Sequence, residues 1–420
     1  MPNLEMASRE RIETQQLARL QIGLTRILPS NRFYREKLFQ RSSSVTVDTM
    51  DDLMRLPFTT KQDLVADQEK YPLFGTNLTY PLRDYIRLHQ TSGTTGRPLK
   101  ILDTSESWDW WASCWATVYQ AAGVSSDDIV FLAFGFGPFI GFWSAYEGAK
   151  RVGALTTPGG SMDSLQRLST IQEIGATVLV CTPSYALRLA EVAQEHGMDM
   201  FSSAVRVTIH AGEPGASVPG TRQRIEHTWG ASAYDHAGMT EMGAYGFACV
   251  EQRGLHVNEE EFIAEILDVQ SGRPVEEGQT GELVLTNLGR WGSPAIRYRT
   301  GDLVRHGGYN CPCGRSFLHL DGGVLGRVDD MLIVRGVNIY PSAIADILHR
   351  FADVREYRVI VTRTGTMDEI ALQIECPPET IPTIQEELRG AFNLRIPVEA
   401  VPEGSLPRFE LKARRVEDRR

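Results

Sequence analysis

The chain has 420 residues, of which 42% are hydrophobic, 23% charged and 9% aromatic. This length predicts two or three folding units, and the composition is that of a globular protein, not of a disordered or fibrous one. A net charge of -10, from 43 basic and 53 acidic residues, argues against general binding to nucleic acid or to an anionic membrane. Small anionic ligands remain compatible with local basic pockets.

The cysteines and the apolar segments bear on where the protein works. Six cysteines are too few for a disulfide scaffold of this length, so we expect a cytoplasmic location. The first 26 residues lack the apolar stretch of a secretory signal. Residues 129–146 carry no charge, but Gly135, Gly137, Pro138 and Gly141 interrupt them. They therefore predict a buried strand, a glycine-rich turn and a helix, and no membrane span.

The order of predicted elements is typical of an α/β protein. A helical start precedes predicted strands at 129–134, 178–181 and 205–209. A helix is predicted at 185–196, between the last two strands. From about residue 251 the pattern changes to strands separated by turns, for example at 282–286.

The pattern changes again after Arg327. The remaining residues predict a compact α+β unit with strands near Val359 and at 370–374, and a helix near 384–392. We therefore expect two domains, an N-terminal one at 1–326 and a C-terminal one at 327–420. The N-terminal domain would include a β-rich subdomain at about 245–326.

The strongest local signal is a run of glycine and hydroxyl residues before Arg97 and Pro98: Thr91, Ser92, Gly93, Thr94, Thr95 and Gly96. Such a loop can surround phosphate oxygens with backbone N–H groups and hydroxyls. It is not a Walker loop, because no Lys-Ser or Lys-Thr pair follows the second glycine. The alternative interpretation is a flexible polar surface loop.

This run resembles the phosphate loop of the adenylate-forming superfamily, which contains acyl-CoA synthetases, adenylation domains and luciferases. Residues 234–241 resemble its adenine and magnesium motif, 298–302 its ribose motif, and 326–330 with Arg335 and Gly336 its hinge motif. Other segments are similar to phenylacetate-CoA ligase and its relatives, and they lie at 33–37, 60–64, 182–187, 254–257, 265–268, 313–315 and 337–341. The resemblance implies an α/β fold, in which a large N-terminal adenylate-forming domain carries a small mobile α+β C-terminal domain.

The resemblance also implies an activity. ATP would activate an aromatic carboxylic acid as an acyl-AMP, and the thiol of CoA would then take the acyl group. Two alternatives stay open: loading of the acid onto a carrier-protein phosphopantetheine, and a non-catalytic, zinc-stabilised homologue. The implied partner is a small aromatic acid, while an acyl-carrier protein and a homodimer remain open.

Nucleotide and CoA contacts are implied residue by residue. Glu241 would hold Mg²⁺, and Asp302 would accept hydrogen bonds from the ribose hydroxyls. Arg327 would approach the ribose or a phosphate, and Gly336 would line the pantetheine tunnel. The implied contacts around adenine come from Gly212, Glu213, Pro214, Asp235, His236 and Thr240. Ala237 stands where the family has an aromatic residue, so the base would rest either on His236 or on residues 212–214 alone.

Two C-terminal residues have implied roles in the reaction. Lys412 is the only lysine after Arg327 and would bridge the substrate carboxylate and the α-phosphate. Asp329 matches the pivot of the hinge. The plainer alternatives are a surface lysine for Lys412, turn carboxylates for Asp302 and Asp329, and a solvated helix-capping residue for Glu241.

Residues 134–143 contain four phenylalanines and a tryptophan separated by glycines, at the place where the family binds its acid. We expect Phe136, Phe139 and Ile140 to face an aromatic ring, with Ala211 and Gly238 opposite. Core packing is the alternative for each aromatic residue.

Cys249, His256, Cys311 and Cys313 form a thiolate-rich set that suits tetrahedral Zn²⁺. Their spacing is not that of a zinc ribbon, but the resemblance extends to relatives that carry a structural zinc at matching positions. Four protein ligands would make the metal structural, not catalytic. Buried free thiols beside an ordinary histidine are the alternative.

Overall fold

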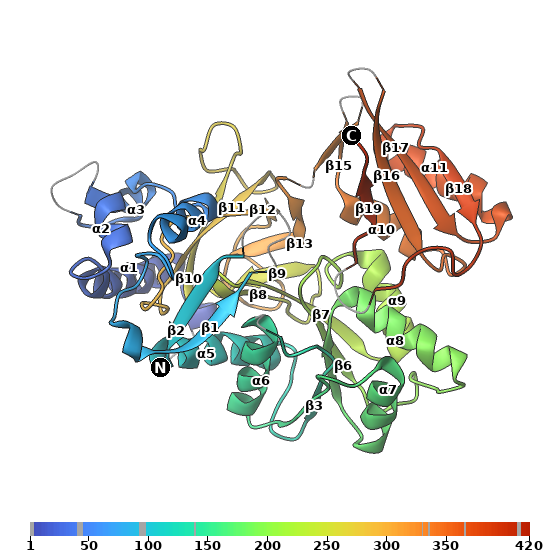
Figure 1. Ribbon diagram of the computed structural model, residues 1–420, viewed down its shortest axis with the longest axis horizontal. Helices are drawn as coiled ribbons and strands as arrows, with labels where there is room; N and C mark the ends of the chain where they lie inside the picture. Colours follow the sequence, from blue (N-terminus) through green and yellow to red (C-terminus); the bar gives the residue numbers. More distant parts are fainter. Residues whose placement is uncertain are drawn as a thin grey trace.

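The computed structural model describes residues 4–39, 45–91, 98–137, 140–329, 331–334, 337–364, 367–409 and 413–420. A large N-terminal domain carries a smaller C-terminal domain, which stands next to helices α8 (Pro183–Glu195) and α9 (Pro219–Trp229) (Figure 1). Among the described residues, no helix combines the length and the apolar character needed to cross a bilayer.

Helices open the described part of the chain: η1 (Leu4–Met6), α1 (Arg9–Ile27), α2 (Arg32–Phe39), α3 (Met50–Arg55) and α4 (Lys61–Lys70). The hydroxyl of Thr60 accepts the backbone N–H of Asp63, whose carboxylate accepts the N–H of Thr60 in return. This capping box fixes the start of α4, and Thr49 with Asp52 does the same for α3. As a result, Lys61 occupies the first turn of α4.

Parallel strands alternating with helices form the first half of a large sheet. These elements are α5 (Ser105–Ala121), β3 (Ile129–Leu132), α6 (Ile140–Val152), β4 (Leu155–Pro158), α7 (Ser164–Glu173), β5 (Val178–Cys181), β6 (Val207–His210) and β7 (Ser232–Met239). The spatial order of the strands is β4, β3, β5, β6, β7. Every residue of β5 is buried, because helices cover both faces of a parallel sheet.

The second half of the sheet is antiparallel and contains β8 (Gly243–Phe247), β9 (Gly254–Val257), β10 (Phe262–Leu267), β11 (Thr280–Asn287), β12 (Tyr298–His306) and β13 (His319–Arg327). Strand β7 pairs with β6 in parallel and with β8 in antiparallel orientation, so eleven strands of the described chain form one sheet. The predicted β-rich subdomain is therefore continuous with the parallel half. A separate hairpin follows η2 (Leu82–Asp84) and consists of β1 (Tyr85–Gln90) and β2 (Lys100–Thr104).

The C-terminal domain contains β14 (Leu332–Val334), β15 (Val337–Ile339), α10 (Pro341–His349), β16 (Tyr357–Thr364), β17 (Met367–Glu375), η3 (Pro378–Thr380), α11 (Ile381–Phe392), β18 (Val398–Val401) and β19 (Val416–Asp418). Its buried apolar residues form a cluster of their own, which begins at Leu332. The main cluster of the N-terminal domain reaches Leu320. The division between the two cores thus lies between Leu320 and Leu332, in β13 or in the short stretch that follows it.

Local signals predicted several elements closely. The predicted strand at 178–181 coincides with β5. Helix α8 begins two residues before the predicted start, because Thr182 caps it and Pro183 fits its first turn. Residues 129–146 contain β3 and the beginning of α6, as the interrupted pattern predicted.

Candidate active site

Most candidate residues lie at one edge of the large sheet, where the parallel strands end. Ala211 directly follows β6, while Thr240 and Glu241 lie in the short connection between β7 and β8. The carboxyl ends of parallel strands meet at one edge, and open α/β sheets bind ligands there.

Thr91 closes the base of the predicted phosphate loop. Its backbone N–H donates to the Leu99 carbonyl, and its hydroxyl accepts the Leu99 N–H, each at 3.0 Å. These two bonds hold together the ends of the connection between β1 and β2. The loop residues Ser92, Gly93, Thr94, Thr95 and Gly96 lie outside the described residues.

The Glu241 carboxylate is buried at the end of β7. Its Oε1 lies 3.7 Å from Nζ of Lys61 in the first turn of α4. Burial, together with the neighbouring Glu241 carboxylate, holds the pKa of the Tyr298 phenol well above its usual range. Nothing local in the sequence connects α4 with β7, so the sequence alone indicates no role for Lys61.

A buried ion pair supports the turn that carries Glu241. The Arg290 guanidinium donates to both carboxylate oxygens of Asp103 at 2.7 and 2.6 Å, and neither side chain is exposed. A third nitrogen of Arg290 donates to the Thr240 carbonyl at 2.5 Å. The pair thereby connects β2, the chain after β11 and the Glu241 turn. This pair could not be predicted from the sequence, because partners 187 positions apart leave no local pattern.

Asp302 and Arg327 face each other from neighbouring strands. They are paired residues in the register of β12 and β13, and Nη1 of Arg327 lies 3.2 Å from Oδ1 of Asp302. The Tyr245 hydroxyl donates to the other oxygen of Asp302 at 2.9 Å. Arg327 Nε donates to the exposed Asp329 at 3.0 Å. The structure therefore brings together the residues matched to the ribose and hinge motifs.

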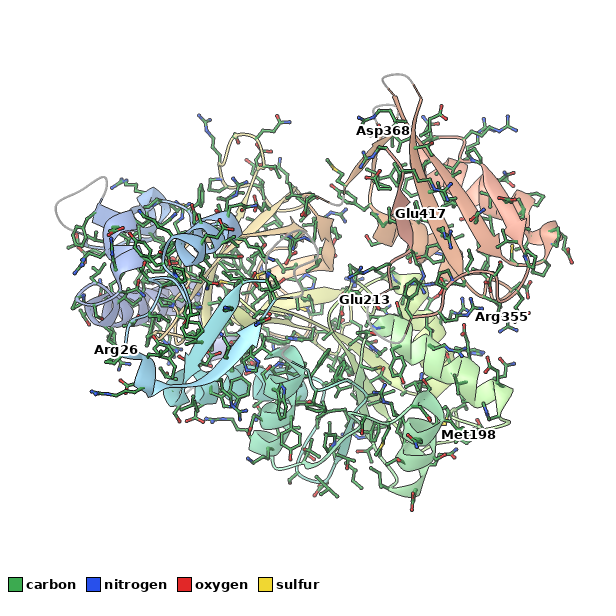
Figure 2. All side chains as sticks on the ribbon, in the orientation of Figure 1. Arg26, Met198, Glu213, Arg355, Asp368 and Glu417 are labelled. Carbon is green, nitrogen blue, oxygen red and sulfur yellow. The ribbon has the colours of Figure 1, made fainter. Side chains whose placement is uncertain are left out.

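The loop after β6 faces the C-terminal domain. Gly212 and Pro214 are exposed, as an open platform for a planar base would require. One Glu213 oxygen accepts the Ser184 N–H and the other accepts the Ala413 N–H, each at 2.9 Å. Figure 2 shows Glu213 at the junction of the two domains. Its carboxylate thus connects the loop with the chain just after residue 412.

Asp235 and His236 are both buried in β7. Asp235 accepts the Ser217 N–H at 3.0 Å, and burial raises the pKa of its carboxyl to about 6. Nδ1 of His236 lies 2.7 Å from the Gly246 carbonyl, and its ring centroid lies 4.2 Å from that of Trp115. Burial lowers the pKa of His236 to about 4, so the imidazole is neutral at pH 7. Asp235 holds the loop before α9, while His236 packs on α5.

The aromatic residues near the start of α6 divide into two pairs. Phe134 and Phe142 stack with centroids 3.7 Å apart, and Phe134 is buried in the core. Phe136 and Trp143 are partly exposed and meet edge to face, with centroids 5.0 Å apart. Ile140 is buried at the first position of α6. Phe142 is also partly exposed, so the second pair is the one in which both rings are accessible to a ligand.

The remaining candidates are unevenly placed. Ala211 is half-buried and Gly238 is exposed, at the ends of the adjacent strands β6 and β7. Phe139, Gly336 and Lys412 lie outside the described residues.

Cys249, His256, Cys311 and Cys313 meet at one place in the antiparallel half, with donor atoms within 4.8 Å of one another. The Cys249 and Cys311 sulfurs are 3.8 Å apart, and the Cys313 sulfur is 3.5 Å from His256 Nε2. Tetrahedral coordination at zinc bond lengths would separate two sulfurs by about 3.8 Å, and sulfur from nitrogen by about 3.5 Å.

The His256 ring is also oriented for coordination. Its Nδ1 lies 3.2 Å from the Phe317 carbonyl, which can accept a hydrogen bond from the N–H of that nitrogen. Nε2 would then present its lone pair to the cluster, as in many metal-bound histidines. The four donors therefore fit a tetrahedral metal.

Comparison with known proteins agrees with this geometry. The family model described as AMP-binding enzyme matches residues 35–289, and that described as AMP-binding enzyme C-terminal domain matches 336–420. The phenylacetate-coenzyme A ligase of Escherichia coli (strain K12) is 32% identical over 436 residues, covering 99% of this chain and 97% of the relative.

Two solved structures of 2-hydroxyisobutyryl-CoA ligase distinguish arrangements of the domains. The postadenylation state with 2-HIB-AMP gives a TM-score of 0.94 at 30% identity, covering 100% of this chain and 92% of that chain. The thioesterification state with 2-HIB-AMP and CoA gives 0.76 at 32% identity, covering 99% and 91%. The two domains are thus arranged here as in the postadenylation state. The chain belongs to the AMP-binding enzyme family and is a homologue of the phenylacetate-coenzyme A ligases.

Proposed function

We propose that this chain is an AMP-forming acid–thiol ligase for an aromatic carboxylic acid, with CoA as the acceptor. In the first step a carboxylate oxygen bonds to the α-phosphorus of ATP, and the bond to pyrophosphate breaks. In the second step the thiol sulfur loses its proton and bonds to the acyl carbon, and the bond to AMP breaks. The observation that carries the proposal is the placement of Glu241, Asp302 and Arg327 around the phenol of Tyr298, which interacts electrostatically with all three, in a member of this family.

The nucleotide is assigned to the residues that converge on this edge. Asp302 would accept the ribose hydroxyls, with Arg327 beside it supplying a positive charge for ribose or phosphate. Glu241 would hold Mg²⁺, which supplies neutralisation of charge on the phosphate oxygens. Lys61 is 3.7 Å from Glu241 and would add a second cation there. Thr91 would anchor the loop that receives the phosphates.

For adenine, the exposed backbone of Gly212 and Pro214 supports binding on the loop after β6. His236 is a weaker candidate for stacking on the base, because its ring already packs on Trp115. Asp235 would act indirectly, by holding Ser217 and with it the end of this loop. Thr240 lies beside Glu241 and is held by Arg290 through its carbonyl.

An aromatic acid is proposed because of the pair Phe136 and Trp143. Their edge-to-face contact leaves a partly exposed apolar surface against which a ring could pack. Phenylacetate, the acid named for the Escherichia coli relative, is therefore the first probe, and 2-hydroxyisobutyrate, named for the structural relative, is the aliphatic comparison.

The Cys/His cluster is proposed to hold a structural Zn²⁺. Three sulfurs and one imidazole nitrogen suit zinc better than Mg²⁺ or Ca²⁺, and four protein donors leave no position for a substrate. Such thiolates also suit a reducing cytoplasm. Elemental analysis of protein purified without chelator should find one zinc per chain. A metal content far below one would contradict the proposal.

The test of the ligase function is acid-dependent exchange of labelled pyrophosphate into ATP, measured without CoA. A panel of aryl, arylacetic and short hydroxy acids is followed by mass spectrometry of thioesters formed with CoA and with a holo carrier protein. We expect exchange with an arylacetic acid and product with CoA. Absence of exchange with every acid would overturn the proposal and favour a non-catalytic homologue. Transfer to the carrier alone would reassign the acceptor.

The role of Lys412 is tested in the same assay. Lys412→Ala should lower exchange at least about 100-fold, because the positive charge between carboxylate and α-phosphate is lost. Lys150→Ala is the matched control, since Lys150 is 65% exposed on α6. Equal exchange in the two variants would refute the assignment of Lys412.

A further inference from the structure

Helix α9 begins at the junction of the two domains without a cap of its own. Its N-cap residue is Val218, which has no polar side-chain atom, and Pro219 follows at the first helical position. The N–H groups of the first turn have no acceptor within a helix. The N–H of Gly220 therefore needs an acceptor from another part of the fold.

That acceptor comes from the C-terminal domain. The Gly220 N–H donates to Oδ1 of Asp346 on α10 at 2.7 Å. The other Asp346 oxygen pairs with Arg350 one turn later on the same helix. The next residue of α9, Thr221, has its hydroxyl 2.7 Å from Nδ1 of His349. Helix α10 thus supplies the cap of α9 from the other domain.

Gly220 also allows the close approach of the two helices. A Cβ at this position would overlap the backbone carbonyl oxygen of Asp346, and it would come within 3.1 Å of Oδ1 of the same residue. Helix α9 itself has no need of a glycine, because alanine is the better helix former by about 1 kcal/mol. The glycine therefore serves the contact between the domains.

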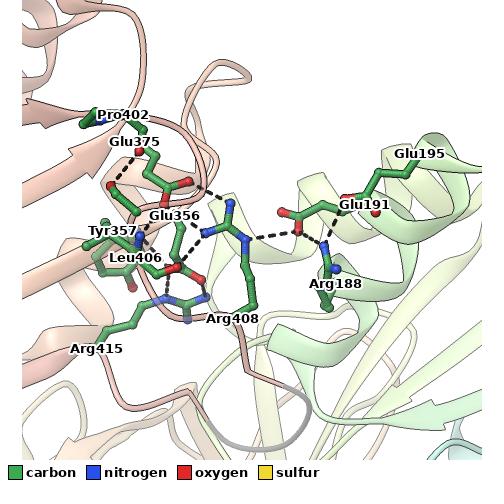
Figure 3. Close-up of polar contacts among 11 residues, drawn as sticks. Arg188, Glu191, Glu195, Glu356, Tyr357, Glu375, Pro402, Leu406, Arg408 and Arg415 are labelled. Atoms are coloured by element: carbon green, nitrogen blue, oxygen red, sulfur yellow. Dashed lines mark hydrogen bonds and ion pairs between the residues drawn. The ribbon is translucent and has the colours of Figure 1, made fainter. Parts of the chain in front are cut away.

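Besides this cap, the Ala413 N–H donates to Glu213 at 2.9 Å, and the arginine contacts between the domains are looser. Arg408 lies 3.8 Å from Glu191 of α8, but it makes its shorter bond, at 2.7 Å, to Glu375 of its own domain (Figure 3). Arg415 donates to the Ser184 hydroxyl at 3.2 Å. Ion pairs that are partly exposed contribute little. The cap of α9 joins two helices through two contacts of 2.7 Å, and it is therefore well suited to define the orientation of the C-terminal domain.

We propose that Gly220 and Asp346 are positioning residues for adenylation. They hold the C-terminal domain in the arrangement in which acyl-AMP forms. Because the donor and the acceptor belong to different domains, a turn of the C-terminal domain toward the thioester-forming arrangement breaks the cap. This inference rests on the proposed function, and it adds two residues that touch neither nucleotide nor acid.

The experiment compares the two half-reactions in four variants of the full chain. Gly220→Ala wedges the helices apart, Asp346→Ala removes the cap, and Asp346→Asn keeps an acceptor oxygen. Gly390→Ala is the control, since a Cβ there meets nothing within 4 Å in helix α11. Adenylation is measured as phenylacetate-dependent pyrophosphate exchange, and thioester formation as conversion of synthetic phenylacetyl-AMP with CoA.

Gly220→Ala and Asp346→Ala should lower exchange about tenfold, the effect of losing a contact of about 1.4 kcal/mol. Asp346→Asn should retain much of the activity, and Gly390→Ala all of it. Thioester formation should stay at or above the wild-type rate in every variant. The inference would be overturned if a variant lost both half-reactions equally. It would also be overturned if Gly220→Ala or Asp346→Ala kept the wild-type rate of exchange.

Hydrogen exchange gives a readout that does not depend on the substrate. The amides of residues 216–222 should exchange faster in Asp346→Ala than in wild type or Gly390→Ala, because the cap of α9 is lost. Unchanged protection would overturn the inference even if the ligase function holds. If instead no acid supports exchange in wild type, the proposed function fails, and the protection data still decide whether the cap exists.

Discussion

Replacement of Arg290 by methionine tests what the buried ion pair beneath the Glu241 turn contributes. The guanidinium makes two bonds of 2.6 and 2.7 Å to Asp103, and both side chains are completely shielded from solvent. Removal of one member leaves an unpaired buried charge, which costs about 3–5 kcal/mol. Arg290→Met should therefore lower the free energy of unfolding of the N-terminal domain by that amount.

Tryptophan fluorescence during a urea titration measures this loss in the N-terminal domain alone. All seven tryptophans of the sequence precede residue 327, so the C-terminal domain contributes no signal. The Trp111 ring lies 5.2 Å from the Arg290 guanidinium and reports on its surroundings. The midpoint of the fluorescence transition is thus the appropriate measurement.

The double variant Asp103→Leu/Arg290→Met separates stability from site geometry. With both charges replaced by apolar groups, most of the lost stability should return. The Thr240 carbonyl would still lack the donor that Arg290 provides, so the KM for ATP should stay raised in both the single and the double variant. A double variant as unstable as Arg290→Met, or one with a normal KM, would refute this reasoning.

Two further outcomes are expected. Burial raises the pKa of Asp235 from 3.8 to about 6, so the folded state keeps a proton that the unfolded chain has already lost. The free energy of unfolding should therefore fall by about 3 kcal/mol as the pH rises from about 4 to about 6. Urea titrations at several pH values measure this slope, which Asp235→Asn should abolish. An unchanged slope in that variant would contradict the assignment to Asp235. Cys313→Ser should lose zinc and about 3 kcal/mol or more of stability, while Cys376→Ser, outside the cluster, should match wild type. A chelator should therefore destabilise Cys376→Ser, which keeps its zinc, and leave Cys313→Ser unchanged. Equal destabilisation of the two variants would contradict the metal site.

The sequence predicted those features that have a local signal. The apolar run at 178–181, ended by Thr182 and Pro183, gave β5 its correct bounds. The motifs around Glu241 and Asp302 indicated the family, and the fold followed from the family. The four possible metal donors were also recognisable by residue type, and the structure brings all four together.

Features that depend on distant pairs could not be predicted. No pattern near Arg290 indicates Asp103, and none near Gly220 indicates Asp346, since each pair forms only after the chain has folded. Burial was equally hidden in the sequence, as His236 shows by packing on Trp115. Such contacts follow from tertiary packing, on which the local alternation of polar and apolar residues carries no information.

The register of β12 and β13 has a consequence for the unstable intermediate. Asp302 and Arg327 are paired residues of the large sheet, and the second core begins only at Leu332. Turning of the C-terminal domain can therefore take place in the few residues after Arg327 without separating this pair. The acyl-AMP, a mixed anhydride, would stay bound to this pair on the N-terminal domain while the C-terminal domain turns and presents different residues to it. Fewer molecules of it would then escape to hydrolysis between the two steps.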